Sequence, residues 1–109
     1  MDTFPQDFNL QNCFKRIEHN QKNLIKDVRQ DFYNLVQEGV EKCEKKVELH
    51  FPDKLWSDNR NILVSEMIDR FGELEVKSER SAEVSVTECI HADEPLPKNV
   101  STIILELWS

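Results

Sequence analysis

The chain has 109 residues, of which 39% are hydrophobic and 32% are charged, and its net charge is −7 at pH 7. This length is typical of one domain, and the composition is polar but within the range of folded chains. With glycine only at positions 39 and 72, no phosphate-binding loop of the G-x-G-x-x-G or G-x-x-x-x-G-K-[ST] kind can be written, which excludes nucleotide cofactors bound in that way.

The first predicted element is a long amphipathic helix over residues 8–46. Apolar residues recur along it at steps of three and four, and Asp7 or Asn9 can cap its start. As one helix, this segment would span roughly 58 Å at about 1.5 Å per residue. A break at residues 20–23, where the apolar stripe lapses, would give a helical hairpin instead. The dominant helical spacing favours the continuous helix.

A continuous helix would extend beyond its own domain. The remaining 63 residues, if compact, would have a radius of gyration of only about 11 Å, so part of the apolar stripe would lack an intramolecular cover. We therefore predict a homo-oligomer that associates through the helix. The spacing keeps a three–four rhythm at first and then steps by four, so the expected contact is a coiled coil with an incomplete heptad pattern. The residues predicted to make it are Leu10, Phe14, Ile17, Leu24 and Val28.

The sequence predicts two parts. Residues 1–46 form an N-terminal helical segment, and residues 47–109 form a small acidic α+β domain with its elements in the order β-α-β-β-β. The predicted elements are strand 47–51, helix 57–71, strand 73–78, a polar turn at 79–81, and strands 83–91 and 102–108. The strands alternate apolar and polar residues, whereas the second helix has apolar residues at helical spacing and Ser57 or Asp58 as its cap. The sequence thus indicates an α+β fold with a mainly antiparallel, four-stranded sheet.

The last predicted strand is apolar on both sides. Ile103, Leu105 and Leu107 form one face, while Ile104 and Trp108 make much of the other face apolar. A strand buried on both sides is usually central in its sheet, with a cover on each face. We expect the second helix to cover one face and the end of the long helix to cover the other, with Trp108 packed beneath the long helix. The alternative is an exposed Trp108, which would be an interaction residue that marks an apolar docking point for a partner.

Acidic residues are concentrated in the predicted α+β domain. Residues 1–46 carry eight acidic and eight basic side chains, whereas residues 47–109 carry thirteen acids and six bases. Such a surface repels phosphate backbones, so direct binding to DNA or RNA is not expected and a basic protein partner suits the domain better. Spaced carboxylates can also imitate phosphates and block the basic groove of a nucleic-acid-binding protein. The residues predicted for this acidic contact are Glu73, Glu75 and Glu83.

Two cysteines and two histidines offer a candidate zinc site. Cys89 and His91 lie two residues apart in a predicted strand, while Cys43 and His50 flank the joint between the long helix and the first strand. Structural zinc sites usually contain two compact pairs, and only one pair is close here. We therefore predict no metal, and we interpret Cys43 as a small hydrophobe on the helix stripe. A Cys–His nucleophile would also need an orienting third group, which the sequence does not offer.

The sequence predicts a cytoplasmic, non-enzymatic protein. Three cysteines without a close pair do not make a disulfide framework, which indicates a reducing compartment. No basic segment followed by an apolar run marks a signal peptide, and apolar runs of at most three residues are too short to span a membrane. We predict a protein–protein interaction or assembly module without a cofactor. The alternative is an acidic inhibitor, or nucleic-acid mimic, that blocks a basic nucleic-acid-binding partner.

Overall fold

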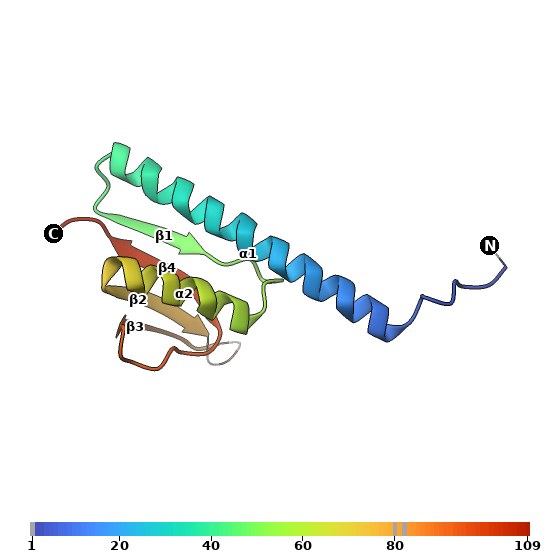
Figure 1. Ribbon diagram of the computed structural model, residues 1–109. Helices are drawn as coiled ribbons and strands as arrows, with labels where there is room; N and C mark the ends of the chain where they lie inside the picture. Colours follow the sequence, from blue (N-terminus) through green and yellow to red (C-terminus); the bar gives the residue numbers. More distant parts are fainter. Residues whose placement is uncertain (1, 80, 82) are drawn as a thin grey trace.

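The computed structural model describes residues 2–79, 81 and 83–109. Its elements are α1 (Leu10–Glu41), β1 (Lys46–His50), α2 (Ser57–Phe71), β2 (Glu73–Glu79), β3 (Ser85–His91) and β4 (Val100–Glu106) (Figure 1). A long N-terminal helix precedes a four-stranded antiparallel sheet with a second helix, which confirms the predicted α+β fold and order of elements. The predicted turn at residues 79–81 includes Arg80, which lies outside the described residues.

α1 is a single helix of 32 residues. It runs unbroken through residues 20–23, so the hairpin alternative is wrong. Asn9 caps its start, because the backbone N–H of Asn12 donates to Asn9 Oδ1 at 2.9 Å. The helix ends at Glu41, earlier than predicted, and Cys43 then adopts a left-handed backbone conformation with φ of 58° that turns the chain toward β1.

The strands are arranged in the order β1-β4-β2-β3, and every neighbouring pair is antiparallel. β4 is therefore a central strand, as its apolar character predicted. Ile103 of β4 pairs with Leu49 of β1 on one side and with Val76 of β2 on the other. All three side chains are fully buried, so the core is centred on this part of the sheet.

Both helices cover the same face of the sheet (Figure 1), so the expectation that the long helix covers the opposite face is wrong. Phe32 of α1 and Val64 of α2 belong to one core cluster with Leu49 and Ile103. The physical reason is the width of the sheet. Four strands about 4.8 Å apart are wide enough for two helices to lie side by side on one face, with their axes about 8–10 Å apart. We call the other face the open face. Its residues include Glu48, His50, Glu73, Glu75, Lys77, Thr87, Cys89, His91, Thr102 and Ile104.

α1 approaches β1 closely at Gly39, which is buried. A Cβ atom at this position would lie 2.5 Å from Cγ2 of Val47 and 3.4 Å from Cδ1 of Leu107. Val47 is itself buried, so its methyl group has little room to move aside. Glycine is therefore required here by the close approach of the helix to the strand.

Replacing Gly39 with alanine is expected to lower the free energy of unfolding by about 1 kcal/mol. Alanine is normally favoured over glycine inside a helix by about 1 kcal/mol, whereas overpacking a core costs about 1–3 kcal/mol. The overpacking should prevail because the predicted contact with Val47 is far shorter than van der Waals separation. Urea unfolding followed by circular dichroism measures the difference, and a variant more stable than the wild type would contradict the expectation.

The molecule is elongated, with extents of 64 × 31 × 26 Å, because α1 extends past the sheet (Figure 1). Gln21 is the first buried residue of α1, and the buried residues that follow it, including Val28 and Phe32, lie in its second half. We call residues 2–20 the overhang. No helix in the described part of the chain combines the length and the apolar character that crossing a membrane requires.

Candidate functional site

The overhang exposes a row of apolar side chains. Leu10 is 87% exposed, although its helical stripe continues to Val28, which is only 4% exposed. The same face of α1 is thus buried in one half of the helix and open to solvent in the other. Large apolar side chains that gather on one exposed segment mark interaction sites. The exposed apolar residues of the overhang are Phe4, Phe8, Leu10, Phe14 and Ile17.

The base of the overhang is fixed by the side chain of Gln21. Its Nε2 donates to the carbonyl of Lys54 at 2.8 Å. Its Oε1 accepts from the backbone N–H of Trp56 at 3.0 Å and from Nδ2 of Asn59 at 3.1 Å. Both polar atoms of the buried amide therefore have hydrogen-bond partners, and the side chain ties α1 to the connection that leads into α2.

The contact made by Gln21 lies next to the start of α2, where a side-chain cap was predicted. α2 has Trp56 at its N-cap position and no side-chain cap, so the assignment of Ser57 or Asp58 is wrong. Gln21 from α1 instead binds the backbone where α2 begins. The ring of Phe14 stacks on Trp56 with centroids 5.9 Å apart. Together these contacts fix the direction in which the overhang leaves the domain.

The overhang begins with a compact aromatic segment, residues 2–9, which we call the arm. The rings of Phe4 and Phe8 stack with centroids 4.8 Å apart. The N–H of Phe8 donates to the carbonyl of Pro5 at 3.0 Å, and Nδ2 of Asn12 donates to the carbonyl of Asp7 at 2.8 Å. The arm is thus held against the first turn of α1 with its two rings exposed.

The exposed apolar area of the overhang is large for so short a segment. Phe4, Phe8 and Phe14 together expose roughly 350–400 Å² if a phenylalanine presents about 200 Å². Each partner in a standard protein–protein interface buries about 800 Å². The three rings alone therefore supply about half of such a contact, and Leu10 and Ile17 extend it.

Two of the predicted contact residues are not available to a partner. Val28 is buried in the core, and Leu24 is partly buried and packs against the core. The reason is that the second half of α1 lies on the sheet together with α2, so its stripe is already covered. Of the predicted helix contact, Leu10, Phe14 and Ile17 remain exposed.

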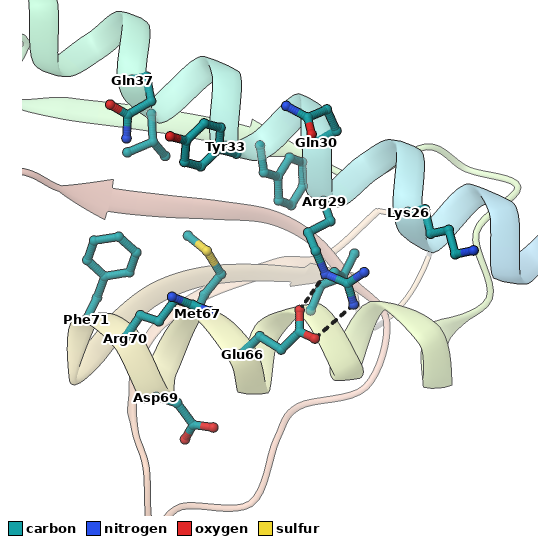
Figure 2. A pocket seen from close by; sticks show the side chains of 13 residues that line it. Lys26, Arg29, Gln30, Tyr33, Gln37, Glu66, Met67, Asp69, Arg70 and Phe71 are labelled. Atoms are coloured by element: carbon teal, nitrogen blue, oxygen red, sulfur yellow. Dashed lines mark hydrogen bonds and ion pairs between the residues drawn. The ribbon is translucent and has the colours of Figure 1, made fainter.

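A groove of about 950 Å³ lies between α1 and α2 (Figure 2). Buried Phe32, Val36 and Leu63 contribute apolar side chains to its lining. Tyr33 of α1 and Phe71 of α2 also line it and are both exposed. The groove therefore combines an apolar lining with aromatic side chains that solvent still reaches.

An ion pair crosses this groove. Arg29 Nη2 donates to Glu66 Oε1 at 2.8 Å and Arg29 Nε donates to Glu66 Oε2 at 3.0 Å (Figure 2). These hydrogen bonds, which the Glu66 carboxylate accepts, raise the pKa of Arg29 above its usual value. Both side chains are nearly half exposed, so the pair contributes little to stability, but it links the two helices.

The acidic residues predicted for a partner are dispersed. On the open face, Glu73 Oε2 lies 3.4 Å from His91 Nδ1, and Glu75 is half-buried opposite Cys89 and Ile104. Glu83 lies apart from them, exposed in the connection before β3. Their carboxylates therefore do not form one continuous acidic row.

The four zinc candidates do not come together. His50 is on β1 and Cys89 and His91 are on β3, which are the two edge strands of the sheet. Three strand spacings of about 4.8 Å separate these edges. No group of three candidate metal ligands occurs among the residues that the structure describes. Cys43 is exposed in the turn after α1, so its interpretation as a packed hydrophobe is wrong.

Trp108 does not pack beneath the long helix, and that prediction is wrong. β4 ends at Glu106, and the side chain of Trp108 is 54% exposed. Its indole Nε1 donates to the carbonyl of Cys43 at 3.2 Å, and Lys45 Nζ lies 5.9 Å from the ring centroid. The chain has already left the sheet at this residue, so the indole lies against the turn between α1 and β1.

Comparison of the chain with protein-family models, curated proteins and solved structures finds no match. The functional interpretation therefore rests on the surfaces described above. Among the described residues, the overhang gathers exposed large apolar side chains on one segment, and the groove has an apolar lining with exposed aromatic side chains.

Proposed function

We propose that this protein is a non-enzymatic assembly module that self-associates through its overhang. The observation that supports this is the exposed row of apolar side chains on a helix whose direction is fixed by Gln21. Covering such a row with protein removes apolar area from water, which stabilises the complex by about 25 cal/mol per Å² buried. The overhang is therefore a surface suited to a partner.

The charge distribution is compatible with a second copy of the chain as the partner. Residues 2–20 carry three acids and two bases, so the overhang is nearly neutral, whereas residues 47–109 hold all of the net negative charge. A nearly neutral segment approaches the acidic domain of another copy without strong repulsion. Its apolar side chains then decide the contact.

The double variant Leu10→Asp, Ile17→Asp is expected to raise the dissociation constant of self-association by at least about 100-fold. Each substitution places a charge where an apolar side chain would be buried, and burial of such a side chain contributes about 1.5–3 kcal/mol. Neither residue belongs to the core, so the domain should stay folded. Sedimentation velocity over a range of concentrations measures the change.

Val84→Asp is the matched control, because Val84 is also exposed and apolar but lies before β3, outside the overhang. It should associate like the wild-type chain. A wild-type chain that remains monomeric at all concentrations would refute the proposed self-association.

A further inference from the structure

We propose that the overhang of one copy docks into the groove between α1 and α2 of the next, so that copies join head to tail. This inference rests on the proposed self-association and assigns the surface that receives the overhang. Each copy would then contribute two different surfaces to the assembly.

The groove matches the arm in size and chemistry. Its volume of about 950 Å³ lies within the range of pockets that hold ligands larger than two aromatic rings. Figure 2 shows Tyr33 on α1 facing Met67 and Phe71 on α2 across the groove. In this contact, the stacked rings of Phe4 and Phe8 insert between these walls, as apolar anchors do when a segment enters a groove between helices.

The charges of the two surfaces are also complementary. The arm carries Asp2 and Asp7 and no basic residue. Lys26 and Arg70 line the groove, and neither makes an ion pair with another described residue. Asp69 also lines the groove, but Figure 2 shows its carboxylate directed away from α1. An acidic aromatic arm therefore fits the accessible charges of the groove.

The positions of the two surfaces on α1 favour a head-to-tail contact over a two-fold pair. Lys26 and Tyr33 follow Leu10 and Ile17 by sixteen residues each. At about 100° per residue, this places Lys26 and Tyr33 about 160° around the helix from Leu10 and Ile17, whereas Phe32, deeper in the groove, lies about 40° from Leu10. Two antiparallel copies that meet along α1 around a two-fold axis bury one side of that helix, so Leu10 and Ile17 do not share that contact with Lys26 and Tyr33 on the far side.

A head-to-tail contact makes a specific prediction about assembly. Because every copy has one overhang and one groove, association continues beyond two chains unless the copies close into a ring. The average mass of the wild-type chain should therefore rise with concentration past that of a dimer. A chain that lacks either surface can still bind through the other one.

The test mixes two full-length variants that each lack one surface. The overhang variant is Phe4→Asp, Phe8→Asp, which alters the two exposed rings placed in the groove, and the groove variant is Tyr33→Glu, Arg70→Glu. For each variant alone, the dissociation constant of self-association should rise by at least about tenfold. Mixed in equal amounts, they should form a complex of one chain of each that grows no further, because the intact groove of the first accepts the intact overhang of the second.

The outcomes separate the two proposals. If the groove variant assembles like the wild type, the overhang has another receptor and the head-to-tail inference is overturned, while self-association through the overhang stands. If both variants stay monomeric when mixed, the inference is likewise overturned. A wild-type chain that stays monomeric overturns both proposals. An arm that occupies the groove of its own chain would give this same result.

Two controls protect the result against misfolding. Leu35→Glu changes an exposed apolar residue of α1 that does not line the groove, and it should assemble normally. The single variant Arg70→Glu alters an exposed rim residue of α2 and should weaken assembly while leaving the circular dichroism spectrum unchanged.

Discussion

Replacing Phe32 with alanine is expected to lower the free energy of unfolding by about 3–5 kcal/mol, the usual range for a large core aromatic. Phe32 is 4% exposed, and its ring packs at a tilt against Phe51 with centroids 5.1 Å apart. It therefore joins α1 to the end of β1. The loss includes both the buried area and the cavity left between helix and sheet. Urea unfolding of the purified chain, followed by circular dichroism, measures it.

Phe14→Ala is the matched control on the same helix. Phe14 is about half exposed and loses only its stacking on Trp56, an aromatic pair worth about 0.5–1.5 kcal/mol. The two variants should therefore differ by at least about 1.5 kcal/mol. Equal losses would mean that the second half of α1 is no more firmly attached to the domain than the overhang is.

The order of elements was predictable because local patterns determine it. Apolar residues recur at helical spacing along α1 despite the lapse at residues 20–23, and Asn9 offers a cap oxygen at its start. β4 was predicted as central from its apolar residues on both faces, and pairing on both of its edges confirms this. These features depend on neighbours in the sequence, where propensity and periodicity act directly.

The placement of α1 was not predictable in the same way. The apolar character of Ile104 and Trp108 suggested a helix on each face, but the sheet takes both helices on one face. Ile104 is only partly buried, and Trp108 lies beyond the end of β4. Periodicity identifies an apolar face without stating which surface covers it. The same ambiguity led to the inclusion of Val28 among residues free for a partner, although it belongs to the core.

The candidate site was predicted in part. Leu10, Phe14 and Ile17 were identified because the helix had to be longer than the domain it joins. The groove arises where two helices far apart in sequence meet, so no local pattern marks it. Two phenylalanines four residues apart in the arm were a signal that could have been used, since such spacing places side chains together in a turn or helix.

Arg60 is a polar residue whose structural role could not be recognised from its neighbours in the sequence. It lies on α2 in an unremarkable polar stretch, but its guanidinium donates to four backbone carbonyls. The acceptors are Pro52, Asp53, Leu55 and Val100 at 2.8–3.1 Å. One side chain thus holds the connection between β1 and α2 and the first residue of β4. Arginine suits this role because its planar fork presents several donors in fixed directions.

Replacing Arg60 with alanine is therefore expected to lower the free energy of unfolding by about 3 kcal/mol. Hydrogen bonds to a charged group are worth about 1.5–3 kcal/mol each, but those of one side chain are not additive, and some of the freed carbonyls can bind water. Arg60→Lys should recover less than half of the loss, since an ammonium group cannot reach carbonyls on both sides. Arg70→Ala, on the same helix but exposed, should cost no more than about 0.5 kcal/mol. If Arg60→Ala proved as mild as Arg70→Ala in urea unfolding, the connection would be held by its apolar residues, Phe51 and Leu55, and the guanidinium contacts would add little to them.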